Sequence, residues 1–385
     1  MKKVAVITGT RAEFGILTPL LKKINNQPEL ELQIVACAMH LSPEFGYTIK
    51  DIEASGFKVD KKIECLLSSD TAVGVSKSIG LALISFAEAF DEISPDLIII
   101  LGDRSEMLAA ATAATIANIP IAHIHGGETT EGAYDESLRH AITKMSYLHF
   151  TSTEIYKRRV IQLGESPNRV FNVGAMGLDS VNELELMNKV EFEKSIDFKL
   201  GPINFLITYH PVTLESETAK DQFKTILNIL NKIEGGKFIF TYANSDKDGR
   251  IINEMIEEFV SQNSERAVVY NSLGHLRYLS ALKYVNCVLG NSSSGILEAP
   301  FFNIPTINIG DRQKGRIAAE SVIHTKNDEN SILQGIKLAL SDDFRVKIKN
   351  QKQIYGDGNS SSKIIDILSK VEIKDLKKKF HDINF

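Results

Sequence analysis

A strand, a glycine-bounded loop and a helix follow one another in residues 4–25, VAVITGTRAEFGILTPLLKKIN. Val4–Thr8 is a short β-branched and apolar run, whereas Phe14–Asn25 carries apolar residues at helical spacing. The loop between them, Gly9 to Gly15, opens the helix, and such a loop presents free N–H groups and the positive end of the helix dipole to an anion. It matches neither the GxGxxG nor the Walker A pattern, so the sequence lacks the fingerprints of NAD and ATP binding.

The same alternation continues along the first half of the chain. Helices are predicted over Thr71–Ile93 and Glu106–Ala117. Further strands are predicted at Leu32–Ala38, Leu97–Leu101, Ile119–Ile124, Leu148–Ser152 and Val170–Val173. Strands that alternate with helices in this way form a parallel sheet covered by helices on both faces.

The second half repeats this architecture after a polar stretch at residues 178–202. Its predicted strands are Asn204–Tyr209, Lys237–Thr241, Ala267–Tyr270, Val285–Leu289 and Pro305–Ile309. We therefore expect an α/β fold of two doubly wound Rossmann-like domains, residues 1–180 and 181–370, and a tail, residues 371–385, with a lysine-rich, solvated helix end. Ligands of such sheets bind beyond the carboxyl ends of the strands, which places the expected site in the cleft between the domains.

The composition is typical of a globular protein with two domains of ordinary size: 385 residues, 43% hydrophobic and 24% charged. A net charge of -5 argues against a nucleic-acid partner, whereas an anionic small molecule needs only a few local cations. Cys37, Cys65 and Cys287 form no CxxC pair, so neither a disulfide nor a zinc framework is expected. We also expect no signal peptide and no membrane-spanning segment, and hence a cytoplasmic location.

Polar residues follow the predicted strands of the first half. Arg11 adds a planar cation, suited to phosphate oxygens, to the first loop. The strand Leu97–Leu101 ends in Gly-Asp-Arg, which delivers the carboxylate of Asp103 and the guanidinium of Arg104 side by side. The alternative is a helix N-cap in which Arg104 pairs with Glu106.

A third stretch combines two histidines, two glycines and several charged residues. In HIHGGE, residues 123–128, His123 and His125 leave the strand on one face because strand side chains alternate. In the helix that follows, Asp135 and Arg139 are four residues apart and share a face. The alternatives are a metal-binding His-x-His pair or a capped helix with a salt bridge. The metal is the weaker of these, because no acidic or cysteine cluster completes a coordination set.

In the second half, His210 and Asn244 each follow a strand, and NSLGH (residues 271–275) and GNSSSGILE (residues 290–298) come later. The second of these loops places small hydroxyl residues and exposed N–H groups before a short helix, which predicts a second phosphate site. Glu298 lies about one turn into that helix, where it could accept hydrogen bonds from a ribose diol. The alternative is an ordinary turn.

These motifs closely resemble those of the UDP-N-acetylglucosamine 2-epimerases. GTRAEFG, LGDR, HGGE, DESLRHAITK, HPVT and GNSSSGILE occur in this order, and the hydrolysing branch of sialic-acid biosynthesis is the best match, from Lys3 to about residue 370. The resemblance implies a GT-B-type fold with UDP in the interdomain cleft. It also implies no cofactor, no metal, and a homodimer or homotetramer.

By position, the resemblance assigns particular residues to the nucleotide. Glu298 would hold the ribose, and His275 would lie near the uracil. Arg312 also matches a family position, and Asn244 is a further candidate for substrate binding. The diphosphate would be held by Arg11, Arg104, Ser292 and Ser293.

The resemblance places the sugar against residues of the first half. Asp103, Asp135 and Arg139 would line its pocket, and His210 would sit beside the diphosphate and the sugar. Family members carry a carboxylate where this chain has His125, which leaves open whether His125 or Glu128 takes that part. The catalytic candidates are therefore Asp103, His125, Glu128, Asp135 and His210.

The implied chemistry is removal of the C2 hydrogen coupled to loss of UDP. Direct removal of this hydrogen is very unfavourable because C2 is not adjacent to a carbonyl group. An acid–base pair moves the protons, and cations and N–H groups stabilise the departing phosphate. Water then adds to 2-acetamidoglucal to give N-acetylmannosamine. The alternatives are a UDP-2,4-diacetamido-6-deoxy sugar as substrate, a non-hydrolysing epimerase, a GT-B glycosyltransferase, or a regulatory UDP-sugar-binding protein.

Overall fold

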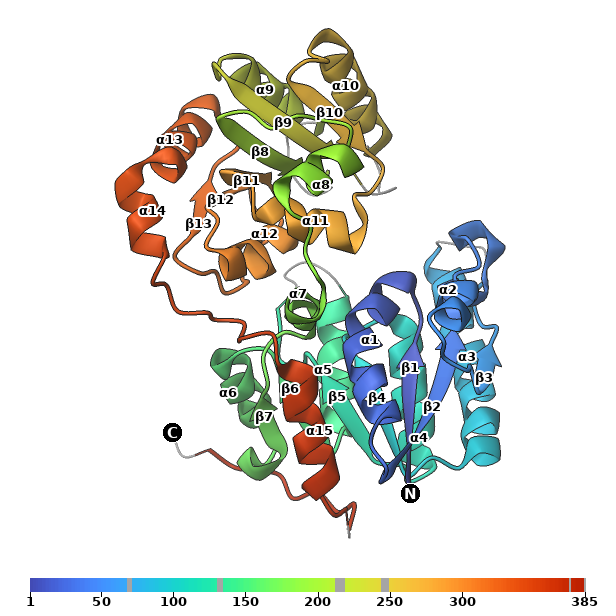
Figure 1. Cartoon of the computed structure of the whole chain (residues 1–385). Helices are drawn as coiled ribbons and strands as arrows, with labels where there is room; N and C mark the ends of the chain where they lie inside the picture. The colour runs from blue at the N-terminus through green and yellow to red at the C-terminus, as the bar shows by residue number, and fades with distance from the viewer. Residues whose placement is uncertain (68–70, 130–133, 212–218, 244–248, 374, 384–385) are drawn as a thin grey trace. The chain divides into compact units, whose positions relative to one another are not determined.

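The computed structural model describes residues 1–67, 71–129, 134–211, 219–243, 249–373 and 375–383. It divides into two compact units, one made of Met1–Ser180 with Tyr355–Phe385 and the other of Val181–Ile354. The prediction that residues 181–370 form the second domain is therefore corrected at its end. The chain returns to the first unit at Tyr355, and α15 (Ser360–Lys370) packs against α1 (Arg11–Asn25) (Figure 1).

A seven-stranded parallel sheet organises the first unit, in the order β3-β2-β1-β4-β5-β6-β7. Its strands are β1 (Lys2–Thr8), β2 (Leu30–Cys37), β3 (Lys61–Ile63), β4 (Leu97–Leu101), β5 (Ile121–Ile124), β6 (Leu148–Thr151) and β7 (Val170–Asn172). All except β3 correspond to strands that the sequence predicted. The order turns at β1 and β4, where chain connections lead to opposite sides of the sheet, the usual place for a ligand.

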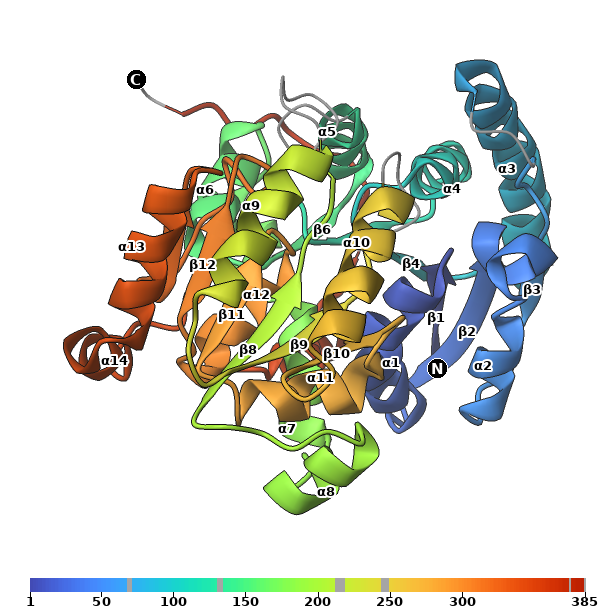
Figure 2. The same ribbon diagram turned by 90° about the horizontal axis from the view of Figure 1, so that it is seen from above.

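Helices cover both faces of this sheet. Apolar residues of α1, α2 (Ile49–Ala54) and α15 pack on one face, and those of α3 (Ala72–Ile93) and α4 (Ser105–Ile116) on the other. Figure 2 shows α1 and α2 on one side of the sheet and α3 and α4 on the opposite side. The remaining helices of this unit are α5 (Asp135–Met145), α6 (Glu154–Gln162) and the start of α7 (Asp179–Glu183).

Helix α3 was predicted from the sequence and is unusually apolar. Among the described residues it is the one helix that is long and apolar enough to cross a membrane, judged by length and composition alone. Its side chains Ala82, Phe86 and Phe90 are buried in the core beneath it. An apolar helix that covers a sheet passes the same test as a membrane span.

The second unit is built around a six-stranded parallel sheet, in the order β10-β9-β8-β11-β12-β13. Its strands are β8 (Ile203–Thr208), β9 (Gly236–Thr241), β10 (Ala267–Tyr270), β11 (Cys287–Gly290), β12 (Thr306–Ile309) and β13 (Val322–Thr325). Its helices are α8 (Lys189–Ser195), α9 (Ala219–Asn231), α10 (Gly249–Gln262), α11 (Gly274–Leu282), α12 (Ser294–Leu297), α13 (Glu329–Leu340) and α14 (Asp342–Ile348). Two parallel sheets, each wound with helices on both faces, confirm the predicted GT-B-type α/β fold.

The sequence predicted that the lysine-rich tail is a solvated helix end, and the structure differs from this prediction. Its Lys378 Nζ donates to Glu165, whose side chain is fully buried, and Lys144 Nζ lies 2.6 Å from the same carboxylate. Burial alone raises the pKa of Glu165, but hydrogen bonds from His149, Lys144 and Lys378 outweigh it and bring the pKa to about 2. The tail is thus anchored to the first unit through a buried carboxylate.

Candidate active site

The first loop is already occupied by one of its own side chains. Glu13 Oε2 accepts hydrogen bonds from the N–H groups of Gly9 (2.8 Å) and Thr10 (3.2 Å), and Glu13 N–H donates to Thr10 Oγ1. Two of the N–H groups expected to face an anion are therefore taken by a carboxylate. The signal was present in the sequence, because Thr10-x-x-Glu13 has the spacing of a capping box.

Two acidic side chains surround Arg104. Its Nε donates to Glu106 Oε1 at 2.6 Å and lies 3.8 Å from Glu13 Oε1. This confirms the alternative in which Arg104 pairs with Glu106, although Arg104 rather than Asp103 occupies the N-cap of α4. Burial and the neighbouring charge of Glu106 raise the pKa of Glu13 to about 7. Arg11 is separate from this group: its side chain is 77% exposed and pairs with Asp51.

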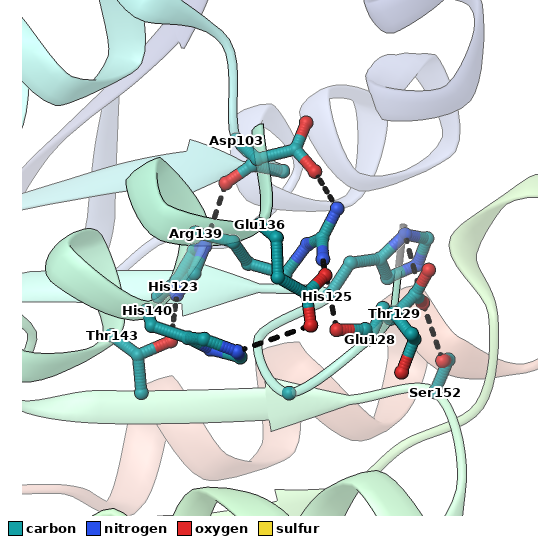
Figure 3. Close-up of polar contacts among 12 residues, drawn as sticks. Asp103, His123, His125, Glu128, Thr129, Glu136, Arg139, His140, Thr143 and Ser152 are labelled. Carbon is teal, nitrogen blue, oxygen red and sulfur yellow. Dashed lines mark hydrogen bonds and ion pairs between the residues drawn. The ribbon is translucent and has the colours of Figure 1, made fainter. Parts of the chain in front are cut away.

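A group of charged residues in the first unit is centred on Arg139 (Figure 3). Its guanidinium, 3% exposed, donates to Asp103 Oδ2, to Glu136 Oε2 at 2.6 Å and to the carbonyl of Glu128 at 2.8 Å. Asp103 follows β4, Glu128 follows β5 and Arg139 lies on α5, so these contacts join three elements at the carboxyl end of the sheet. Burial and the charge of Asp103 raise the pKa of Asp135, at the start of α5.

His123 and His125 have separate partners. His123 is fully buried in β5, where its Nε2 bonds the carbonyl of Gly102 at 2.7 Å and its Nδ1 bonds Thr143 Oγ1 at 3.1 Å. Burial lowers the pKa of His123 to about 3, so it is a neutral support for the turn that carries Asp103. His125 lies after the strand with φ of 66°, so the simple alternation of side chains no longer applies to it.

Glu128 lies next to His125 (Figure 3). Its Oε1 accepts a hydrogen bond from Ser152 Oγ at 2.6 Å and lies 3.6 Å from His125 Nδ1. Both side chains are about one-fifth exposed, so they are sheltered yet reachable. Gly127 has φ of 77°, and a Cβ there would lie 2.6 Å from the carbonyl oxygen of Tyr156, so this turn requires glycine.

In the second unit, Asn291 joins the ends of two neighbouring strands. Its Oδ1 accepts from His210 N–H at 2.7 Å and its Nδ2 donates to the His210 carbonyl at 2.8 Å. Gly290 makes this approach possible: its φ is 138°, and a Cβ there would lie 1.9 Å from the carbonyl oxygen of Thr208. His210, 7% exposed, is thereby held at the carboxyl end of β8.

A pocket of about 340 Å³ opens at this edge of the second sheet. Ser292, Ser294 and Tyr278 share hydrogen bonds along one side of it. Glu298 Oε2 has no hydrogen-bond partner among the described residues, and burial raises the pKa of Glu298 to about 7. The pocket is lined by Thr208, His210, Thr241, Tyr242, Asn271, Ser272, Leu273, Gly274, His275, Tyr278, Ser292, Ser294 and Glu298.

Several lining residues were missed by the sequence analysis, and some candidates lie elsewhere. Tyr278 is one turn beyond His275 on α11, a spacing that could have pointed to it. Arg312 donates to the carbonyl of Asn291, in the loop after β11, at 3.2 Å and is not among the residues that line the pocket. Ser293 is not among the lining residues either. Asn244 lies outside the described residues.

Comparison with known proteins points to one family. A family model described as UDP-N-acetylglucosamine 2-epimerase matches residues 22–369. The GDP/UDP-N,N'-diacetylbacillosamine 2-epimerase (hydrolyzing) of Campylobacter jejuni is 44% identical over 89% of both chains. A polysialic acid biosynthesis protein of Escherichia coli is 38% identical over 100% of this chain and 98% of its own. The solved UDP-GlcNAc 2-epimerase of Neisseria meningitidis, bound to UDP-GlcNAc, shares the fold with a TM-score of 0.81 at 20% identity, covering 96% of this chain and 100% of that one.

Proposed function

Because the chain belongs to the UDP-N-acetylglucosamine 2-epimerase family, we propose that it is a hydrolysing 2-epimerase of a UDP-linked 2-acetamido sugar. Its products would be UDP and the free sugar inverted at C2. The observation that carries this proposal is a group of acidic residues near Arg139. The carboxylate of Asp103 and the main-chain carbonyl of Glu128 both bind the Arg139 guanidinium, and Asp135 is close enough to feel the charges of Asp103 and Arg139. A protein that only binds a UDP-sugar has no need of several acid–base groups in one place.

The carboxylates have environments suited to opposite tasks. Asp103 pairs with Arg139, and this contact holds its carboxyl group beside the end of β4, where we propose that it accepts the C2 proton. Burial and the charge of Asp103 raise the pKa of Asp135, which favours a carboxylic acid that can return a proton. We propose this assignment, with Glu128 as the further group that activates water.

The reaction then proceeds in two balanced steps. In the first, the C2–H bond breaks, its proton passes to the base, the C1–C2 double bond forms, and the C1–O bond breaks so that UDP leaves with the bond's electron pair. In the second, the oxygen of water bonds to C1 while one water proton passes to the carboxylate of Glu128, and a proton from the protein's acid reaches C2 from the opposite face. Hydrogen-bond donors aimed at the leaving phosphate stabilise its growing charge. We propose that Ser292 and the loop after β11 supply such donors and that Glu298 binds the ribose.

UDP-N-acetylglucosamine is the substrate that we propose first, with N-acetylmannosamine as product. The name of the Campylobacter jejuni relative, at 44% identity, favours a UDP-2,4-diacetamido-6-deoxy sugar as the second candidate. Both molecules carry an acetamido group at C2 and a diphosphate at C1, so the same chemistry applies. Separate incubation with each sugar nucleotide and identification of the free sugar will distinguish them.

The isotope content of the products tests the mechanism. In heavy water, the sugar product should carry deuterium at C2, because the protein's acid, exchanged with solvent, delivers the new proton. In water labelled with ¹⁸O, UDP should gain no label, because the C1–O bond breaks rather than the O–P bond. A sugar that keeps its original C2 hydrogen, or UDP that gains the label, contradicts the elimination route.

Arg11→Ala should weaken UDP binding only slightly, by less than about 1 kcal/mol. The side chain of Arg11 is 77% exposed and already pairs with Asp51, and exposed ion pairs contribute little. Titration calorimetry of UDP against the variant and the wild-type protein checks this. A hundredfold loss of affinity would show that Arg11 leaves Asp51 and contacts the diphosphate directly.

A further inference from the structure

The backbone of His125 adopts a conformation that residues with a Cβ seldom adopt. Its φ is 66°, in the left-handed region that few residues other than glycine, asparagine, aspartate and histidine adopt. Its N–H donates to the carbonyl of Phe150 in β6 at 2.8 Å, so the unusual backbone is fixed to the sheet. Strain of this kind persists where the surrounding structure holds the residue for a purpose, and it directs attention to the imidazole.

The imidazole connects two segments that are 51 residues apart. Its Nε2 accepts a hydrogen bond from the N–H of Met176 at 3.2 Å. Because Nε2 accepts this hydrogen bond, the hydrogen of the neutral ring lies on Nδ1. Nδ1 in turn lies 3.6 Å from Glu128 Oε1. His125 therefore stands between Glu128 and the N–H of Met176.

Met176 belongs to the segment through which the chain leaves the first unit. The first unit ends at Ser180 and resumes at Tyr355, so residues 174–180 and 355–361 form what we call the crossing. Its two segments are bonded to each other, since Ala175 N–H donates to the Tyr355 carbonyl at 2.8 Å.

A buried carboxylate fastens the crossing further. Asp179, 2% exposed, accepts hydrogen bonds from the N–H groups of Ser360 (2.8 Å) and Ser361 (2.5 Å) at the start of α15. An acidic side chain at a helix N-terminus is favourable both as a cap and against the helix dipole. The outgoing and returning segments are thus joined by hydrogen bonds on both sides of Met176.

We propose that His125 is a positioning residue that couples the crossing to Glu128. A displacement of the crossing, through which both connections to the second unit pass, moves the Met176 N–H and with it the imidazole beside Glu128. His125 would thereby set the position of Glu128 without itself touching the reacting atoms. This inference rests on the proposed function.

The test removes each end of the His125–Met176 hydrogen bond. His125→Asn keeps a residue that tolerates positive φ but is too short to reach the crossing. Met176→Pro removes the N–H, and proline is tolerated at the first position of a helix, where Met176 stands. Met176→Ala is the matched control, because it removes the same buried side chain but keeps the N–H.

Turnover of the UDP-sugar is measured for the single variants and for both double variants. His125→Asn should lower kcat about 10- to 100-fold, the usual consequence of a misplaced reacting group. Met176→Pro should lower kcat by a similar factor relative to Met176→Ala, and KM and UDP affinity should stay within about twofold. In the His125→Asn background, Met176→Pro and Met176→Ala should be equal, because coupled residues are not additive. Additive losses, or a thousandfold loss in His125→Asn beside a silent Met176→Pro, would overturn the proposal.

Amide hydrogen exchange supplies a readout that needs no turnover. The peptide covering residues 174–180 should exchange faster in His125→Asn than in wild type, because the Met176 N–H loses its acceptor. Unchanged exchange would overturn the proposed coupling even if the activities change. A wild-type protein that releases no epimerised sugar, yet shows the faster exchange in the variant, would contradict the proposed function and leave the coupling in place.

Discussion

Asp103→Asn should lower kcat by about two to four decades and leave UDP affinity within about twofold. A positioned acid–base group contributes about 10²- to 10⁴-fold to a rate, and asparagine keeps the shape of the side chain while losing its basicity. The amide oxygen of asparagine can still accept from Arg139, so the buried guanidinium keeps a partner. The measurement is steady-state release of UDP, together with calorimetric titration of UDP.

Glu136→Gln is the matched control for this prediction. Glu136 Oε2 is a second carboxylate partner of Arg139, at 2.6 Å, so its loss changes the charge around Arg139 by the same amount. We expect less than a tenfold decrease in kcat, because Glu136 serves Arg139 and not the substrate. Equal losses in both variants would show that the charge balance of Arg139, and not a proton acceptor at Asp103, sets the rate. Near-normal turnover in Asp103→Asn alone would direct the search for the base to Asp135 and Glu128.

The sheets could be predicted well because parallel strands with two covered faces are continuous apolar runs. LIIIL at Leu97–Leu101 was predicted with its observed bounds, and AVVY at Ala267–Tyr270 likewise. The two strands that were missed lie at sheet edges. β3 has the sequence KKI and β13 the sequence VIHT, and edge strands carry polar residues because one side has no neighbour.

The place of the site along each strand could also be predicted, because side chains at the carboxyl ends of parallel strands gather at one edge. The partners of those side chains could not. Arg139 reaches Asp103 across 36 residues, and His125 reaches Met176 across 51. A single sequence contains no periodicity that links positions so far apart. The roles assigned to these residues therefore stay predictions.

The first loop illustrates how one motif can predict two opposite structures. A glycine-bounded helix start favours an anionic ligand, but a Thr10-x-x-Glu13 capping box supplies the anion from within the chain. The Glu13 carboxylate occupies the N–H groups because it is part of the same chain. Unlike a free ligand, it loses no translational entropy when it binds them. In the part of the chain that the structure describes, no carboxylate accepts from the N–H groups of the loop after β11, and Oε2 of the nearby Glu298 has no partner there.

Glu298→Gln should weaken UDP binding by about 1.5–3 kcal/mol at pH 8, which corresponds to about 10- to 150-fold in Kd. In the proposed site the ionised carboxylate would accept hydrogen bonds from the two ribose hydroxyls, whereas glutamine would offer one weaker acceptor. Glu298 lines the pocket, and its buried Oε2 has no hydrogen-bond partner among the described residues, so that oxygen has no hydrogen bond to lose when a ligand binds. A Kd unchanged in this variant would remove Glu298 from the ribose site.

The pH dependence of UDP binding should depend on the same group. Burial raises the pKa of free Glu298 to about 7, and ribose hydroxyls that donate to the carboxylate favour the ionised form and lower that pKa in the complex. UDP binding therefore releases a proton below pH 7, and affinity should rise with pH up to a plateau above about pH 8. Glu298→Gln lacks this titration, so subtracting its profile removes the contribution of the UDP phosphate itself. A wild-type profile parallel to that of Glu298→Gln between pH 6 and 8 would show that Glu298 does not change its protonation when UDP binds.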